Sequence, residues 1–359
     1  MNLLITGICG FVGSTLARAL RDQAAPGSLE IFGIDNLCRR GSETNVEALE
    51  RGGIRVFKGD IRSEADVGAL PDADWVIDCA ANPSVLAGID GKGGSRELFD
   101  HNLVGTLNVL EYCKTRAAGF ILISTSRVYS IRPLVGLALQ ERDGAFEPDP
   151  RQAWPDGLSP HGISEEFSTA PPISLYGASK AASEIVALEY GEAFGFPVWI
   201  NRCGLLAGAG QFGRADQGII AYWINAWLRG HPLTYIGFKG SGHQVRDVLH
   251  PADLVPLLAK QMRGPDASKP RVCNFGGGIE GAISLRHLSD WCGGRFGGRQ
   301  VGENPENRPF DVPWVVMDCR AAERHWDWRP LRKPATIFEE VAGHAAARPD
   351  WLTISGVGG

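Results

Sequence analysis

The sequence lacks any long apolar run, and no stretch approaches the roughly 20 residues that a membrane-spanning helix needs. A signal peptide is not expected either, because the first expected strand begins at Asn2. Eight cysteines are present without a single Cys-x-x-Cys pair, so neither a zinc site nor a disulfide framework is indicated. We therefore expect a cytoplasmic protein with no metal site and no membrane partner.

An excess of basic charge is also missing. The chain has 36 Lys and Arg against 41 Asp and Glu, and its net charge is −5 at pH 7. This balance gives no electrostatic footprint for nucleic acid, and the pair Arg39-Arg40 is too small to supply one. The 359 residues, 44% of them hydrophobic and 21% charged, suit one α/β domain with a smaller substrate domain.

The chain opens with an apolar segment that runs directly into glycines. Gly7, Gly10 and Gly13 follow one another at three-residue intervals after Leu3–Thr6. Glycines in such a loop permit a tight turn, close approach of the backbone to a pyrophosphate, and close packing of helix on strand. The helix expected over residues 11–23 would direct its N-terminal N–H groups at the phosphates. The segment therefore predicts a dinucleotide site.

A second expected strand, over residues 30–34, ends at Asp35, about twenty residues beyond the glycines. A carboxylate at this place suits the two ribose hydroxyls of NAD and would repel the 2′-phosphate of NADP. Arg39 and Arg40 leave the choice open, since arginines can accommodate that phosphate or contact the adenine. The sequence favours NAD.

Further apolar strands are expected over residues 56–61, 75–81 and 120–125, and a helix over 96–116. Strands that alternate with helices predict a parallel, doubly wound Rossmann-type sheet, which binds its ligands at the carboxyl ends of the strands. Polar residues fall at those ends. Asp60 with Ile61 would lie beside the adenine, and Ala80, Ala81 and Asn82 beside the pyrophosphate and nicotinamide ribose.

Tyr176 and Lys180 are four positions apart, so on a helix they share one face. A nearby ammonium favours the phenolate, whereas an unperturbed phenol with a pKa near ~10 is a poor base at neutral pH. A tyrosine activated in this way can take a proton from an alcohol while a hydride leaves the same carbon. The spacing alone is common on solvated helix faces, and the dinucleotide pattern upstream is what favours a catalytic pair.

In these marks the chain resembles the extended short-chain dehydrogenase/reductases, the NAD-dependent nucleotide-sugar epimerases and dehydratases. The matching residues are Thr6–Gly13, Asp60-Ile61, Asn102 with Gly105-Thr106, Ser124-Thr125, and Tyr176 with Lys180. The segments 212–218 and 242–250 are more specific and resemble the CDP-tyvelose (CDP-paratose) 2-epimerases.

The resemblance implies roles for individual residues. Tyr176 would be the base, Lys180 its electrostatic partner and ribose ligand, and Thr125 a hydrogen-bond partner of the reacting sugar oxygen. The implied NAD-binding residues are Gly7, Gly10, Phe11, Val12, Gly13, Asp35, Asn36, Arg40, Asp60, Ile61, Ala80, Ala81, Asn82, Asn102, Ser124, Tyr176, Lys180 and Arg202. The implied substrate ligands are Thr125, Gln211, Asp216, Gln217, Gly218 and Arg246, with Arg246 on the pyrophosphate.

Two departures from the family pattern bear on activity. Sugar 4,6-dehydratases place an Asp-Glu pair directly after the threonine, whereas this chain has Ser126 and Arg127, so dehydration is not expected. Leu205 stands where many members have an asparagine, and a leucine cannot make that polar nucleotide contact.

The expected activity is epimerisation at C2 of a CDP-linked deoxyhexose by transient oxidation to a keto sugar. A UDP-sugar 4-epimerase, a net sugar dehydrogenase or reductase, and a non-catalytic NAD-binding regulator remain alternatives. We expect residues 1–202 and 244–280 to form the nucleotide-binding domain, with 130–172 inserted over the active site. Residues 203–243 and 281–359 would form the substrate domain, and the resemblance implies a homodimer or homotetramer.

Overall fold

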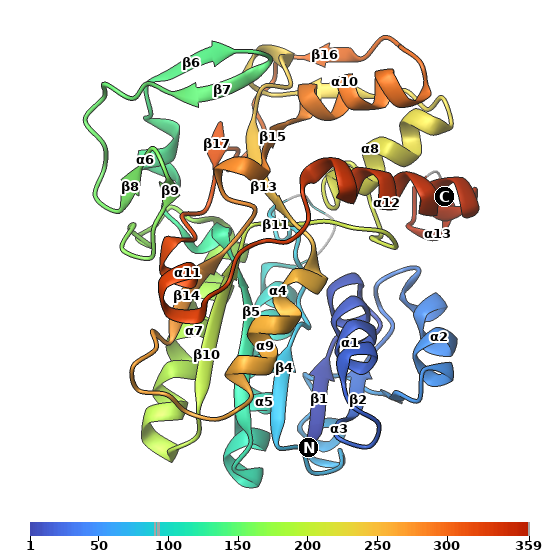
Figure 1. Ribbon diagram of the computed structural model, residues 1–359, viewed down its shortest axis with the longest axis vertical. Helices are drawn as coiled ribbons and strands as arrows, with labels where there is room; N and C mark the ends of the chain where they lie inside the picture. The colour runs from blue at the N-terminus through green and yellow to red at the C-terminus, as the bar shows by residue number, and fades with distance from the viewer. Residues whose placement is uncertain (90, 92–93, 358–359) are drawn as a thin grey trace.

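The computed structural model describes residues 1–89, 91 and 94–357, and a seven-stranded parallel sheet forms its base (Figure 1). The strand order is β14-β10-β5-β4-β1-β2-β3. The order runs outward from β1 in both directions, which is the doubly wound arrangement predicted from the sequence. The strands are β1 (Asn2–Thr6), β2 (Glu30–Asp35), β3 (Arg55–Lys58), β4 (Trp75–Asp78), β5 (Gly119–Thr125), β10 (Val198–Cys203) and β14 (Val272–Phe275).

Helices cover both faces of this sheet because its strands are apolar on both sides. In β5, Ile121 points into the cluster that contains Leu16 of α1, while Phe120 and Leu122 point into the cluster that contains Val109 of α5. The helices of the first face are α1 (Phe11–Gln23), α2 (Val46–Arg51), α9 (Val255–Gln261) and α11 (Arg320–Trp326). Those of the second are α3 (Glu64–Gly68), α5 (Gly105–Arg116) and α7 (Ser174–Phe194).

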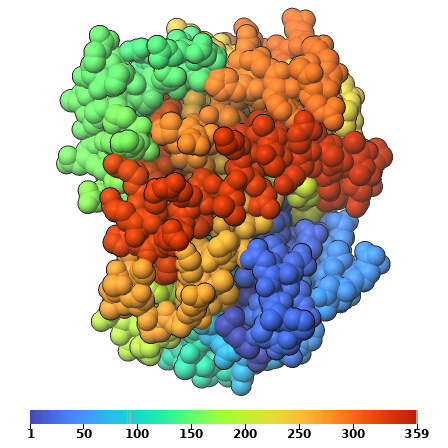
Figure 2. All heavy atoms as spheres, in the orientation of Figure 1, coloured from blue at the N-terminus to red at the C-terminus, as the bar shows by residue number. Residues whose placement is uncertain are grey.

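A second, smaller unit lies at the carboxyl ends of these strands (Figure 1). Its sheet contains β11 (Leu205–Leu206), β13 (Val245–Leu249), β15 (Ala282–Ser284) and β17 (Trp314–Val315), and a separate pair is β12 (Thr234–Ile236) with β16 (Gly302–Asn304). Its helices are α8 (Ile219–Leu228), α10 (Leu285–Phe296), α12 (Pro334–Ala347) and α13 (Trp351–Ile354). In Figure 2 the C-terminal segment crosses the visible face as a red band between the two units.

The insertion 130–172 is folded and packs on the second unit. It folds as α6 (Ile131–Val135) and two hairpins, β6 (Leu139–Arg142) with β7 (Ala145–Pro148) and β8 (Leu158–Ser159) with β9 (Gly162–Ile163). Its apolar side chains are buried against Val312 and Val316, and none of its residues is among those that line the cavity described below. Burial of those side chains attaches the segment to the second unit, and a cover over a bound sugar stays a prediction.

The remaining short elements connect these layers. They are α4 (Ser95–Phe99), a π-helix η2 (Asp100–Val104), and the 3₁₀ turns η1 (Ser42–Asn45), η3 (Ser126–Val128), η4 (Phe238–Gly240), η5 (Pro251–Leu254) and η6 (Ile279–Gly281). Within the segment 244–280, β13 pairs with the second sheet, whereas β14 pairs with β10 in the first. Over the described part of the chain, none of the helices combines the length and apolar character that a membrane crossing requires.

Candidate active site

A cavity of about 720 Å³ lies at the carboxyl ends of the seven-stranded sheet and extends to the second sheet. Its walls come from the loop between β1 and α1, the ends of β2, β4 and β5, the start of α7, the loop 211–218 and strand β13. This is the edge at which doubly wound sheets bind ligands. The cavity brings together residues that are more than 200 positions apart in the sequence, such as Gly7 and Arg246.

The glycine loop forms the floor of one end of the cavity. Gly7 has a positive φ of 59°, and a Cβ built on it would lie 2.9 Å from the Cα of Ala80. A Cβ on Gly13 would lie 2.3 Å from the carbonyl oxygen of Gly7. Both positions therefore require glycine, and the bare backbone leads into the N-terminus of α1, where a pyrophosphate is favourably bound.

Asp35 ends β2 beside this loop. Its Oδ2 accepts a hydrogen bond from the N–H of Cys9 at 2.9 Å, and its Oδ1 accepts one from Leu37 at 2.8 Å. Burial raises the pKa of Asp35, and these backbone hydrogen bonds oppose the rise. Each carboxylate oxygen keeps a further lone pair, so ribose hydroxyls can still donate to it. The glycine cradle and this carboxylate together fit an NAD molecule.

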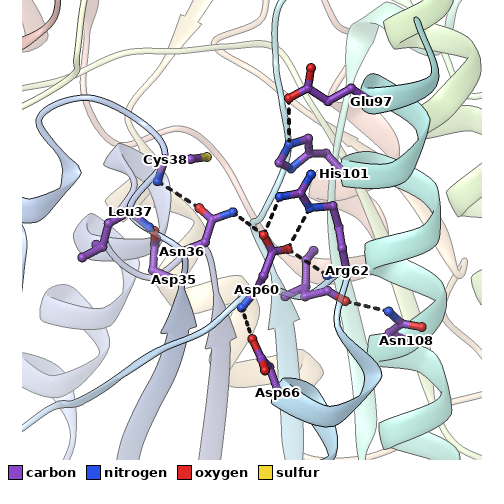
Figure 3. A network of polar contacts seen from close by, with 11 residues as sticks. Asp35, Asn36, Leu37, Cys38, Asp60, Arg62, Asp66, Glu97, His101 and Asn108 are labelled. Atoms are coloured by element: carbon purple, nitrogen blue, oxygen red, sulfur yellow. Dashed lines mark hydrogen bonds and ion pairs between the residues drawn. The ribbon is translucent and has the colours of Figure 1, made fainter. Parts of the chain in front are cut away.

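Asp60 belongs to a polar network at the end of β3 and does not line the cavity (Figure 3). The Nη2 of Arg62 donates to its Oδ2 at 2.6 Å, and the Nδ2 of Asn36 donates to the same oxygen at 2.9 Å. The hydrogen bonds from Arg62 hold the pKa of Asp60 below its usual range. Asp60 thus positions Asn36, which lines the cavity together with Ile61.

Asn102 also acts from behind the cavity wall. It is fully buried, and it accepts a hydrogen bond from the N–H of Asn82 at 2.7 Å while its Nδ2 donates to the carbonyl of Asn82 at 3.0 Å. The same Nδ2 donates to the hydroxyl of Ser179 in α7. Asn102 therefore fixes the loop after β4, in which Ala80 and Ala81 line the cavity, to the helix that carries Tyr176.

Tyr176 and Lys180 both line the cavity, and their side chains are 8% and 2% exposed. Burial raises the pKa of Tyr176 to about 12, while its hydrogen bond with Thr125 and the charge of Arg127 lower it. Burial lowers the pKa of Lys180, and the charges of Asp78 and Glu184 oppose that change. Among the described side chains of the protein, Arg127 is the cation that lowers the pKa of the Tyr176 phenol. A bound cationic nicotinamide would act in the same direction.

A buried ion pair supports the floor of the cavity next to Lys180. Arg202 donates through Nε and Nη2 to Glu184, the shortest distance being 2.6 Å, and the hydroxyl of Ser124 donates to the same carboxylate at 2.5 Å. The Nη1 of Arg202 also donates to the hydroxyl of Tyr129 at 3.2 Å. Arg202 therefore does not line the cavity, and only Ser124 of this group does.

The expected substrate ligands are also part of the cavity wall. Thr125, Gln211, Asp216, Gln217, Gly218 and Arg246 all line the cavity. The Nη1 of Arg39 donates to the Oε1 of Gln217 at 2.7 Å and its Nη2 to the carbonyl of Phe212, so the loop 211–218 is held to the cofactor half. Leu205 also lines the cavity, and its side chain has no polar atom for a nucleotide contact.

The structure brings most of the expected cofactor residues to the cavity wall. These are Gly7, Gly10, Phe11, Val12, Gly13, Asp35, Asn36, Ile61, Ala80, Ala81, Ser124, Tyr176 and Lys180. Five others do not line it: Arg40, Asp60, Asn82, Asn102 and Arg202. Arg40 is exposed beside Gly356, and its neighbour Arg39 lines the cavity in its place.

Arg308 and Asp311 both line the cavity and were not predicted from the sequence. The Nη2 of Arg246 donates to the Oδ1 of Asp311 at 3.3 Å, and the Nη1 of Arg308 donates to the carbonyl of Ala215 at 3.4 Å. The only signal for them in the sequence is an arginine and an aspartate within the proline-containing segment 305–313.

A glycine cradle, an acid at the end of β2 and a Tyr-Lys pair on α7 define an NAD-dependent enzyme of the extended short-chain reductase type. The model of the NAD dependent epimerase/dehydratase family matches residues 3–276, and the chain belongs to this family. NAD is its cofactor, and its curated relatives include enzymes that act on nucleotide sugars.

Curated relatives with different activities have the same percentage identity to this chain. The chain is 29% identical over 349 residues to the CDP-paratose 2-epimerase of Salmonella typhi, covering 92% of this chain and 95% of that protein. It is also 29% identical over 342 residues to a dTDP-glucose 4,6-dehydratase of Streptomyces antibioticus, covering 92% and 88%.

Solved structures show the same fold. The UDP-glucose 4-epimerase of Thermus thermophilus in complex with NAD has a TM-score of 0.75 at 25% identity, covering 96% of this chain and 99% of that one. The UDP-glucuronic acid 4-epimerase of Bacillus cereus, solved with UDP-glucuronic acid and NAD, has a TM-score of 0.78 at 24% identity, covering 97% and 99%.

Proposed function

We propose that this chain is a cytoplasmic nucleotide-sugar 2-epimerase that interconverts CDP-paratose and CDP-tyvelose. The observation that carries the proposal is one continuous cavity that joins a dinucleotide cradle at Gly7 to Tyr176 and on to Arg246. An epimerase needs this continuity, because the sugar must reach the cofactor while its diphosphate stays bound. The likeness to the CDP-paratose 2-epimerase of Salmonella typhi supports the choice of sugar and base.

In this proposal, Tyr176 removes the proton of the C2 hydroxyl and returns it after the sugar has turned over. Thr125 orients the reacting oxygen. The charges of Asp78 and Glu184 stabilise the ammonium of Lys180, which binds the nicotinamide ribose. Gly7, Gly10 and Gly13 would seat the pyrophosphate of NAD, with Asp35 on its adenosine ribose. NAD, when bound, supplies the hydride acceptor and donor.

Water loss from the sugar is not part of the proposal. The two residues after Thr125 that line the cavity are Ser126 and Arg127, and neither side chain is a carboxylic acid. The dehydratases that this chain resembles have their acid pair at these two positions, where proton transfer to the leaving hydroxyl takes place, and this chain has no acid there. The similarity to a dTDP-glucose 4,6-dehydratase is therefore taken as a likeness of family and not of reaction.

The test is to incubate the purified protein with CDP-tyvelose, without added NAD, and to follow the sugar protons by NMR. We expect steady formation of CDP-paratose, because an epimerase consumes no net cofactor. A protein that contains NAD but leaves CDP-tyvelose unchanged would contradict the proposed substrate. Turnover of UDP-glucose or UDP-glucuronic acid under the same conditions would then assign a 4-epimerase, and formation of one NADH for each sugar oxidised, with added NAD, would assign a dehydrogenase.

We further propose that the protein is a homodimer or homotetramer through α5 and α7. These helices pack on each other, and their outer surface exposes Leu107, Ile185 and Phe194, with Ile185 64% exposed. Light scattering after size-exclusion chromatography tests this, and Ile185→Glu should shift the protein toward monomer. A monomeric wild-type protein at micromolar concentration would contradict it.

A further inference from the structure

Two arginines of the cavity wall are attached to consecutive residues of one segment. The Nη1 of Arg127 donates to the carbonyl of Phe310 at 3.3 Å, and the Nη2 of Arg246 donates to the Oδ1 of Asp311 at 3.3 Å. Both arginines line the cavity. Their anchors are adjacent in the chain, and the charge of Arg246 acts on the guanidinium of Arg127, so the two groups are neighbours in the cavity wall.

Arg127 is also fixed to the catalytic side chains. Its N–H donates to the Oγ1 of Thr125 at 3.2 Å. Its carbonyl packs against the backbone of Gly177, where a Cβ would lie only 2.3 Å from that oxygen. Arg127 is therefore held next to Thr125 and Tyr176 on one side and next to Arg246 on the other.

The guanidinium of Arg127 has unused hydrogen-bonding capacity. Among the described residues it forms no ion pair within 4.0 Å, and the carbonyl of Phe310 is its single side-chain hydrogen-bond acceptor. Burial and, to a smaller extent, the charge of Arg246 lower the pKa of Arg127 to about 10 against the opposing charge of Asp311, so the group is still a cation at neutral pH. A partly buried cation with free N–H groups in a cavity calls for an anionic ligand.

The covalent structure of a nucleotide sugar limits which anion this can be. The β-phosphate is attached to C1 of the sugar, so the hydroxyl on C2 and the phosphate oxygen on C1 are vicinal. The hydroxyl on C4 lies across the ring from that phosphate. A cation placed directly beside the catalytic tyrosine can therefore reach the β-phosphate when C2 reacts, but not when C4 reacts in the same place.

We propose that Arg127 binds the β-phosphate of the nucleotide sugar and thereby seats the sugar with C2, and not C4, at Tyr176. The inference rests on the proposed function and adds to it the residue that selects the reacting carbon. Arg246 holds the diphosphate from its other side, and Arg127 is the link between the diphosphate and the reacting carbon.

The first test compares nucleotides that differ only in the β-phosphate, using calorimetry on the NAD-containing protein with CDP, CMP, UDP and UMP. Arg127→Gln should lower the affinity for the nucleoside diphosphate of the preferred base on the order of tenfold to a hundredfold, as expected for loss of a charged hydrogen bond. The affinity for the corresponding monophosphate should stay within about twofold of the wild type. Arg127→Lys should recover part of the loss because it keeps the charge. Arg40→Gln, outside the cavity, is the matched control.

The second test uses the wild-type protein and asks which C–H bond breaks. In competition between labelled and unlabelled CDP-tyvelose, deuterium at C2 should slow turnover and deuterium at C4 should not. The inference is overturned if Arg127→Gln weakens CDP and CMP equally, or if the isotope effect belongs to C4. If no CDP-sugar turns over while the CDP and CMP affinities still separate in Arg127→Gln, the proposed substrate fails and the phosphate contact stands.

Discussion

Replacing Asp247 should change how the stability of the protein depends on pH. Asp247 is 1% exposed and lies in β13, between the two sheets. Its Oδ2 accepts hydrogen bonds from the N–H groups of Met317 and Gly278, both at 3.2 Å, while its Oδ1 is buried without a partner among the described residues. A Cβ on Gly276 would lie 2.0 Å from this carboxyl group, so the backbone closes tightly around it.

This environment raises the pKa of Asp247 to about 7, mainly through burial, with the backbone N–H groups opposing the rise. In the unfolded chain an aspartate titrates near ~3.9. At pH values between these two pKa values, Asp247 is protonated in the native state and ionised in the unfolded state. The free energy of unfolding therefore falls as the pH rises. From about pH 5 to about pH 8 the loss attributable to this carboxyl is roughly 2–3 kcal/mol.

The measurement is urea unfolding of the wild type and of Asp247→Asn at a series of pH values. Asparagine keeps the shape and cannot ionise, so the stability lost on going to high pH should be smaller in the variant by that amount. Any cost of the new amide is the same at every pH, and other titrating groups cancel in the comparison. If both proteins lose the same stability between these pH values, Asp247 is not protonated in the native state and the argument fails.

Three further predictions concern the cavity. Tyr176→Phe should lower turnover by about a hundredfold to ten-thousandfold with bound NAD unchanged, and turnover within tenfold of the wild type would exclude Tyr176 as the base. Glu184→Gln should reduce the free energy of unfolding by about 3–5 kcal/mol because it leaves Arg202 buried without its counter-ion, and the double change Glu184→Leu with Arg202→Met should recover much of that loss. In denaturant titrations, a cost well below 1 kcal/mol for the single variant would contradict this. Arg39→Met should release NAD at least about tenfold faster, since it loses charged hydrogen bonds that hold the loop over the cavity, and Arg40→Met should not, as measured by NAD content after gel filtration.

The cofactor half of the site could be predicted because its requirements are local. Gly7 and Gly13 are needed by contacts with the backbone of neighbouring turns, and a strand followed by glycines shows that need directly in the sequence. Asp35 lies at the end of an apolar strand, which fixes its position at the sheet edge. Fold class and cofactor follow from such short segments.

The residues whose positions differ from expectation depend on contacts between distant segments. The family resemblance implies Arg40 as a cofactor ligand, but Leu37 adopts a positive φ of 57° and the chain turns so that Arg39 lines the cavity. Arg202 is expected to bind the cofactor, but in the folded chain its guanidinium forms a buried ion pair with Glu184 of α7 instead. The insertion 130–172 has the composition of an open loop, yet apolar residues spaced along it are buried against the second unit.

This contrast explains why substrate choice is harder to infer than cofactor choice in such a chain. The cofactor is bound largely by the backbone of the glycine loop. Only glycine fits at Gly7 and Gly13, so the requirement can be recognised in the sequence. The substrate half is built from single side chains of Arg127, Gln217, Arg246 and Asp311, each supplied by a different loop or strand. In our proposal, the position of Arg127 beside Tyr176 selects the carbon next to the phosphate as the one that reaches the base. The sequence does not reveal this arrangement, because Arg127 and Tyr176 are brought together only by the fold.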